Sequence, residues 1–268
     1  MSADEQALRA EREQRREVRE ANRARLRAEA KDAVDRADTG GRPRRGARRS
    51  ATPRAKLPTV PLALDEPEVA INRLVGAERA PTYVKALGAA SQAFARERYH
   101  DARRLLAPAL KAVPEVAEVA ELQGLIQYRL GNWKAAADQL ERFRVLTGTA
   151  EQHPVLADCY RALQRYGDVD ELWDELRAAS PSAELVTEGR IVTAGALADQ
   201  SDLTGAVELL EKGWTRPKRP KTHHLRRAYA LADLYERNGR APRARELFRW
   251  IESNDAAFGD VGDRVASL

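Results

Sequence analysis

The sequence predicts an all-α protein: an α-solenoid of about five helical hairpins that follows a charged N-terminal arm. The main observation is a period of 34 residues that separates Tyr99 from Trp133 and brings Ala102 into register with Ala136. A short polar turn precedes each of the two aromatic residues. Charged residues make up 32% of the chain and aromatic residues 6%, which suits a well-solvated helical protein. A lone hairpin cannot bury its apolar stripe, so stacked neighbours must supply the core.

An ordinary helical bundle with an accidental period is the alternative. The predicted turns coincide with the 34-residue register, which favours repeats over that alternative.

The arm, residues 1–60, has two parts. Residues 1–38 carry ten Lys/Arg and ten Asp/Glu, with i,i+4 pairs such as Glu5–Arg9 in the favourable order. Apolar residues are too sparse for a continuous stripe, so we expect a solvated helix; an amphipathic helix for a partner is the alternative.

Residues 39–60 carry seven Lys/Arg and no acid, with three glycines and three prolines, and we expect this basic linker to be disordered. Residues 1–60 have a net charge of +7 and the remainder −2, so the basicity belongs to the arm. The linker is either a solubilising tail or a contact for phosphates or acidic surfaces. The contact residues would be Arg42, Arg44, Arg45, Arg48, Arg49, Arg54 and Lys56.

A connector and capping helix is expected over residues 61–82, with the helix running from Pro67 to about Ala80 and Asp65 as its N-cap. The repeats then occupy residues 83–254. Residues 255–268 are expected to form the polar C-terminal cap that a solenoid needs for solubility.

A second basic cluster begins at Arg216 and continues to Arg227, and no acid interrupts Thr215 to Ala232. Its prolines predict a projecting loop over residues 216–227. The side chains expected to contact phosphates or acidic surfaces are Arg216, Lys218, Arg219 and Lys221. The pair His223–His224 does not predict a metal site, because adjacent residues rarely bind one ion together.

The spacing and the residues of the repeat resemble the tetratricopeptide repeat family. The family's small residues correspond to Ala90 and Gly124, then Ala102 and Ala136, and the last unit matches best, with Leu231, Ala232, Tyr235, Gly239 in the turn, Ala244 and Phe248. Two degenerate units lie between, at about 153–181 with Gly167 in its turn and at about 187–214. The chain is also similar to actinobacterial-type proteins in which a basic arm precedes degenerate repeats, a likeness that implies no activity.

The resemblance implies a concave groove, lined by the first helix of each hairpin, that takes a peptide of a partner. The groove residues it implies are Phe94, Tyr128, Arg129, Arg161, Arg165, Tyr229 and Arg237. The arginines at 129, 161 and 165 would form either a cationic patch for a carboxylate or phosphate, or a merely solvated face. The clamp of chaperone-binding members is absent, because its positions hold Leu87, Ser91, Glu121 and Leu125.

Other functional classes find no support in the sequence. The single cysteine, Cys159, excludes an internal disulfide and is expected to be a buried, inert thiol. No apolar run approaches the roughly 20 residues of a membrane span, and the start lacks the features of a signal peptide, so we expect a cytoplasmic protein. We find no catalytic constellation, metal site or phosphate loop, and expect neither enzymatic activity nor a cofactor.

The preferred function is therefore a non-catalytic scaffold that binds a protein partner through the groove. The alternative is an RNA- or ribosome-associated protein that contacts phosphates through the arm and the 216–227 loop.

Overall fold

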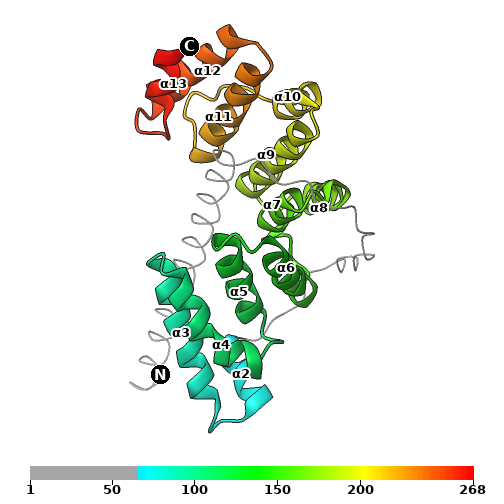
Figure 1. The fold of residues 1–268 in the computed structure, drawn as a ribbon, viewed down its shortest axis with the longest axis vertical. Coiled ribbons are helices and arrows are strands. Elements are labelled where there is room, and N and C mark those ends of the chain that lie inside the picture. The colour runs from blue at the N-terminus through cyan, green and yellow to red at the C-terminus, as the bar shows by residue number, and fades with distance from the viewer. Residues whose placement is uncertain (1–65) are drawn as a thin grey trace, which may run out of the picture. The chain divides into compact units, whose positions relative to one another are not determined.

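The computed structural model describes residues 66–268. The expectations for the arm, and for Asp65 as an N-cap, lie outside the described residues. Within them the chain forms twelve helices and no strand (Figure 1). The helices are α2 (Pro67–Val75), α3 (Ala80–Ala95), α4 (Tyr99–Ala112), α5 (Ala117–Arg129), α6 (Trp133–Thr147), α7 (His153–Ala162), α8 (Tyr166–Ala179), α9 (Ala183–Asp199), α10 (Leu203–Glu211), α11 (Thr222–Arg237), α12 (Ala241–Asn254) and α13 (Val261–Ser267).

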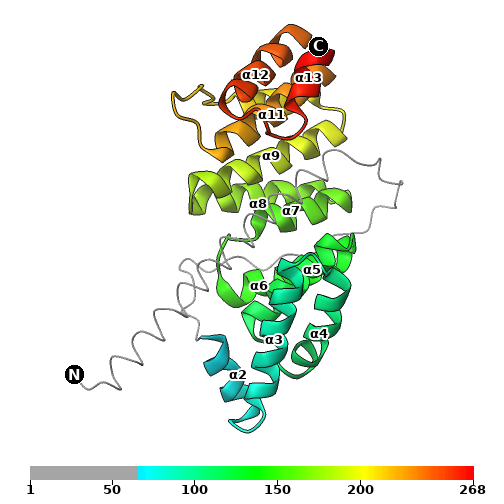
Figure 2. The ribbon, with the colours of Figure 1, turned by 90° about the vertical axis from the view of Figure 1, so that its left-hand side faces the viewer.

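The described chain divides into two units, residues 66–132 and residues 133–268. In the first unit α2 packs on α3, α3 on α4 and α4 on α5. In the second unit α6 packs on α7, the pairs α7–α8, α9–α10 and α11–α12 follow, and α13 closes the end against α12 (Figures 1 and 2). The expected all-α architecture of successive helical hairpins is confirmed. The boundary between the units lies between Asn132 and Trp133, where the turn after α5 ends and α6 begins.

The 34-residue register is confirmed by where the second helices begin. Helix α4 starts at Tyr99 and helix α6 at Trp133. Both alanines of the register, Ala102 and Ala136, have no exposed surface, as expected of small residues at positions where helices approach closely.

Five three-residue turns between consecutive helices share one backbone geometry. The central residue is left-handed in each: Glu97 (φ 58°), Gly131 (73°), Gln164 (57°), Ser201 (70°) and Gly239 (72°). In every case the next residue's N–H donates to the carbonyl five residues earlier, over distances from 2.7 to 3.0 Å. This is the Schellman ending of a helix, which satisfies carbonyls that the last turn leaves open.

Two local predictions were wrong. Gly167 lies in the first turn of α8, and the left-handed residue of that turn is Gln164, because a side chain at this position is tolerated where the hydrogen bonds hold it. The capping helix begins at Pro67 as expected but ends at Val75, where Gly76 (φ 81°) turns the chain; its N-cap residue is Glu66, with no side-chain cap bond.

Helix α9 crosses α8 at a glycine. A Cβ atom built on Gly189 would lie 2.3 Å from Cδ2 of Leu176 and 3.5 Å from the Trp173 ring. Both residues are buried and pack with Ala150, while Leu185, Val186 and Leu209 surround them. The helices approach this closely only because the glycine has no side chain.

Arginines tie together the helices of the second unit. Arg144 on α6 is only 2% exposed and donates to both carboxylate oxygens of Glu175 on α8, with the shortest contact 2.8 Å. Arg226 on α11 binds both oxygens of Glu188 on α9 at 2.6 Å. Such bidentate pairs fix the relative orientation of the two side chains and also add electrostatic attraction between them.

Two further arginines hold the C-terminus of the short helix α10. Arg227 on α11 donates to the carbonyls of Leu210 and Lys212, at 2.8 and 2.7 Å, and Arg190 on α9 donates to that of Leu209 at 3.0 Å. Cations at this end also complement the helix dipole. Burial, together with the neighbouring Arg190, lowers the pKa of Arg227 to about 10.

Candidate partner-binding site

The aromatic residues expected in the groove belong to the core. Phe94 is 2% exposed and packs edge-to-face on Tyr99, with ring centroids 5.4 Å apart, and Tyr128 is 3% exposed. The repeat register identifies the helix that carries a side chain correctly, but it does not say how deeply that side chain is covered. These two residues therefore offer little surface to a partner.

The three arginines expected to form a cationic patch each face a carboxylate of their own unit. Arg129 lies 3.7 Å from Glu97 and above the Tyr99 ring, with its side chain 4% exposed. Arg129 belongs to the first unit, whereas the other two arginines belong to the second. Each guanidinium is thus paired with a carboxylate within its own unit, and the exposed fraction of the side chain rises from 4% at Arg129 to 36% at Arg165.

Arg161 and Arg165 show the same pairing within the second unit. Arg161 binds Asp158 at 2.8 Å and Asp199 on α9 at 3.2 Å. Arg165 donates to both oxygens of Asp168 and stacks on Tyr160, 4.2 Å from the ring centre. Burial alone would lower the pKa of Arg165, but its hydrogen bonds to Asp168 more than offset this and raise it.

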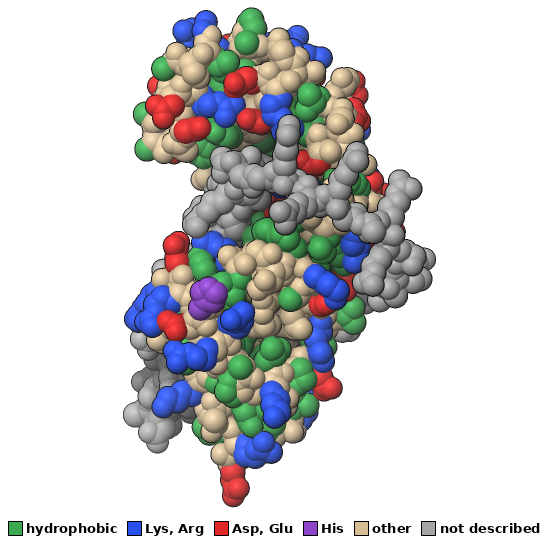
Figure 3. All heavy atoms as spheres, in the orientation of Figure 1, with side chains coloured by type: hydrophobic (Ala, Val, Ile, Leu, Met, Phe, Trp, Pro, Cys, Tyr) green, Lys and Arg blue, Asp and Glu red, His purple; other side chains and the backbone are tan. Residues whose placement is uncertain are grey.

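The expected groove residues of α11 contact the C-terminal part of the chain or their own helix. The Tyr229 hydroxyl donates to Asp260, and its ring lies 5.4 Å from that of Phe248. Arg237 is half-exposed and pairs with Asp233 at 3.7 Å. On the face seen in Figure 3, Lys and Arg side chains lie among Asp and Glu side chains over α11–α13, in keeping with such pairing.

The basic loop is shorter than the sequence predicted. Helix α11 begins at Thr222, so the second half of the 216–227 segment is helical, and Arg226 and Arg227 bind Glu188 and the end of α10 instead of projecting. This part of the basic segment is helical because apolar residues recur at helical spacing and are buried. They are Leu225, Ala228, Leu231, Ala232 and Tyr235.

The true loop, residues 212–221, carries five Lys/Arg and no acid. Lys218 and Arg219 are exposed, while Arg216 pairs with Glu246 at 2.9 Å and Lys221 approaches Glu184 to 3.9 Å. Of the side chains expected to contact phosphates, these four lie in the described residues; those of the arm do not.

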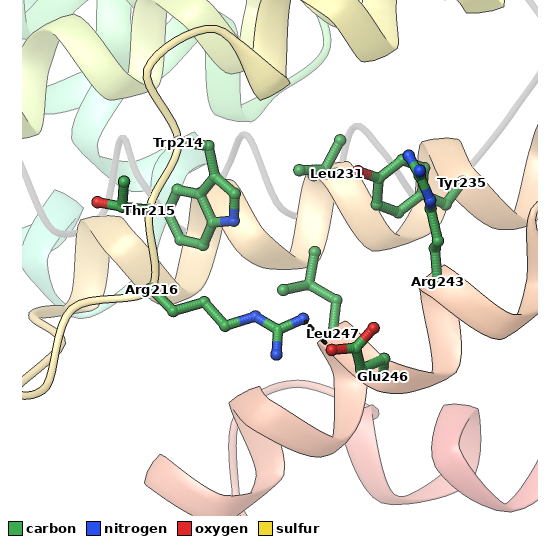
Figure 4. A pocket seen from close by; sticks show the side chains of 8 residues that line it. All are labelled: Trp214, Thr215, Arg216, Leu231, Tyr235, Arg243, Glu246 and Leu247. Atoms are coloured by element: carbon green, nitrogen blue, oxygen red, sulfur yellow. Dashed lines mark ion pairs between the residues drawn. The ribbon is translucent and has the colours of Figure 1, made fainter.

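A cavity of about 320 Å³ lies between this loop, α11 and α12 (Figure 4). Trp214 and Arg216 come from the loop, Leu231 and Tyr235 from α11, and Arg243, Glu246 and Leu247 from α12; Thr215 completes the lining. Sequence reasoning placed Arg216 at a contact surface but missed the rest. The available signal was Trp214, the one large aromatic residue in the basic loop.

The polar side of this cavity has a defined arrangement. The Tyr235 hydroxyl donates to Glu211, and Arg243 lies 3.4 Å from the same carboxylate. Burial is the main cause that raises the pKa of Tyr235, and the hydrogen bond to Glu211 raises it further. The cavity is thus lined by a phenol, the Glu246 carboxylate and two guanidinium groups, above the buried side chains of Leu231 and Leu247.

The part of the chain that the structure describes contains no group of three or more His, Cys, Asp or Glu side chains arranged to hold a metal ion. None of its helices is long and apolar enough to cross a membrane.

Comparison with known proteins places the architecture. A thermophilic TPR protein of Thermus thermophilus, TTC0263, superposes with a TM-score of 0.53 at 21% identity, over 69% of this chain and 97% of that one. A putative kinesin light chain of Podospora anserina with nearly identical TPR-like repeats gives 0.52 at 18% identity, over 72% and 98%. The fold is that of tetratricopeptide repeat proteins. No family model and no curated protein matches the sequence.

Proposed function

We propose that this protein is a non-catalytic scaffold that binds a protein partner. The observation that carries the proposal is that helix pairs with turns of one geometry recur in both units, as α3–α4 in the first and as α7–α8, α9–α10 and α11–α12 in the second. Stacked helical repeats form extended concave surfaces, which suit contact with another chain more than the enclosure of a small molecule.

The contact surface that we propose lies on the first helices α7, α9 and α11 of the second unit. Of the groove residues implied by the family resemblance, Arg161, Arg165, Tyr229 and Arg237 remain candidates there. Arg237 is the most exposed of them, with 47% of its side chain accessible, and its ion pair with Asp233 is an exposed one. Such pairs contribute little to stability, so a partner's carboxylate can compete for the guanidinium.

The test is capture of partners from an extract of the source cells, with and without nuclease. The baits are the full-length protein, a chain shortened to residues 61–268, and the full-length variants Arg237→Glu and Arg245→Glu. Arg245 is an exposed residue of the second helix α12 and serves as the matched charge reversal.

We expect one discrete protein that survives nuclease and removal of the arm, is retained by Arg245→Glu and is depleted by Arg237→Glu. Recovery of RNA or ribosomal proteins alone, only with the arm present and only without nuclease, would overturn the scaffold function. Equal capture by both charge reversals would remove α11 from the contact surface.

A further inference from the structure

The cavity under the 212–221 loop is separate from the surface proposed above, since none of the candidate residues Arg161, Arg165, Tyr229 and Arg237 lines it. Its volume, about 320 Å³, falls at the lower end of the range for ligand pockets. That is room for one large side chain and its neighbours. Leu231 and Leu247 lie beneath the cavity with 0% and 2% of their surface exposed, so the apolar surface that a ligand can reach is mainly the partly exposed Trp214 ring.

The wall formed by Trp214 is held in place without a ligand. Its backbone N–H donates to the Glu211 carbonyl at 2.8 Å, and its ring lies edge-on to Trp250 with centroids 5.8 Å apart. The guanidinium of Arg227 lies 5.4 Å from the same ring, and Arg227 is itself fixed on the end of α10. A wall that is already ordered lowers the entropy lost on binding.

The rim is cationic. The loop carries five Lys/Arg and no acid, and Arg243 adds a side chain that is 61% exposed. The two carboxylates at the rim, Glu246 and Glu211, pair with Arg216 and Arg243 over 2.9 and 3.4 Å. Both pairs are largely exposed and can be exchanged for pairs with a ligand.

We infer that this cavity binds an acidic peptide segment of a partner protein that carries an aromatic or aliphatic side chain. The apolar side chain packs on the ring of Trp214, above the two buried leucines, and flanking carboxylates of the peptide bind Arg216 and Arg243. Trp, Tyr and Arg are the residues that dominate the binding energy of protein interfaces, and all three line this cavity. The charge of the loop complements an acidic peptide.

The inference deepens the proposed function, on which it rests, by naming a second surface and the chemistry of what binds there. The experiment uses the full-length protein and short fluorescent peptides in which one phenylalanine is flanked by glutamates. Control peptides replace the phenylalanine with serine, or the glutamates with lysines. A short oligouridylate of similar length tests for nucleic acid. Binding is read from fluorescence anisotropy at two salt concentrations.

The diagnostic variant is Arg216→Gln combined with Arg243→Gln, which removes two exposed charges without placing like charges together. We expect it to weaken binding of the glutamate–phenylalanine peptide by about tenfold or more, and the matched Arg245→Gln to leave it unchanged. The serine peptide should bind more weakly, and higher salt should weaken all binding. Circular dichroism and urea denaturation establish that both variants are folded.

Three results would overturn the inference: equal binding of the lysine-flanked peptide, unchanged binding by the double variant, or tighter binding of the oligouridylate at the same residues. The last would assign the surface to nucleic acid. If these peptides fail but the partner captured from the extract is retained by the double variant, the scaffold function stands and only this cavity loses its role.

Discussion

Replacing Gly189 with alanine tests the close crossing of α8 and α9. The new Cβ would lie 2.3 Å from Cδ2 of Leu176, more than an ångström inside ordinary contact. Leu176 is 1% exposed and has Trp173, Leu185 and Leu209 around it, so it cannot simply move aside.

Two effects of opposite sign set the magnitude. Alanine inside a helix is more stable than glycine by about 0.5–1 kcal/mol, whereas overpacking a core costs about 1–3 kcal/mol. Overpacking wins, and we expect Gly189→Ala to lower the free energy of unfolding by about 0.5–2 kcal/mol.

The assay is urea denaturation followed by tryptophan fluorescence. All four tryptophans lie at or beyond residue 133, so this signal reports the second unit alone. The matched control is Gly167→Ala on α8, where an added Cβ meets nothing within 4 Å. This control should be neutral or slightly stabilising.

A double variant isolates the contact. In a Leu176→Ala background the space that the added methyl group needs is already open, so the loss caused by Gly189→Ala should vanish. The reasoning is refuted if Gly189→Ala matches the wild type in stability, or if its effect is the same in both backgrounds.

Three further predictions concern single side chains. At the left-handed turn positions, Ser201→Gly should raise the free energy of unfolding by a few tenths of a kcal/mol to about 1 kcal/mol, whereas Gly239→Ala should lower it by about 1 kcal/mol. Urea titrations measure both changes, and the same sign for both would contradict the turn geometry. Burial raises the pKa of the Cys159 thiol well above its ordinary value, so a thiol reagent should label the native protein no faster than the second unit unfolds. Labelling within the mixing time would show that the thiol is accessible. Burial, followed by the hydrogen bond to Asp260, raises the pKa of the Tyr229 phenol above its ordinary value of about 10. The folded state therefore keeps a proton that the unfolded chain releases, and stability falls as the pH rises above about 10. Tyr229→Phe should lose less stability than wild type between about pH 9 and about pH 11 in urea titrations, and an equal loss would exclude this phenol as the cause.

Much of the fold was predictable because the repeat depends on small residues and helix starts that a sequence displays directly. Tyr99 and Trp133 begin second helices, and Ala102 and Ala136 are buried, as the period required. The turn at Gln164 was misplaced because a left-handed residue need not be glycine when backbone hydrogen bonds hold it.

The candidate site was harder to predict, for a physical reason. Whether Phe94 faces solvent or the core depends on the position of Tyr99 beside it, which a register position does not encode. The cavity beside Trp214 likewise arises from the meeting of a loop with α12, about 30 residues away in the chain. The predicted loop was too long because basic composition was given more weight than the helical spacing of apolar residues after Leu225.

The hydrogen bonds that hold the end of α10 also fix the start of the 212–221 loop that follows it. Arg227 and Arg190 fix its beginning at the carbonyls of Lys212 and Leu209, and at its far end the Lys221 N–H donates to His224 on α11. Neither anchor uses a side chain of residues 215–220, and the ion pair that Arg216 makes with Glu246 on α12 is an exposed one that adds little to stability. Those six residues can therefore be exchanged for a foreign sequence while the helices keep their places, which makes the loop a natural graft site for altering partner specificity.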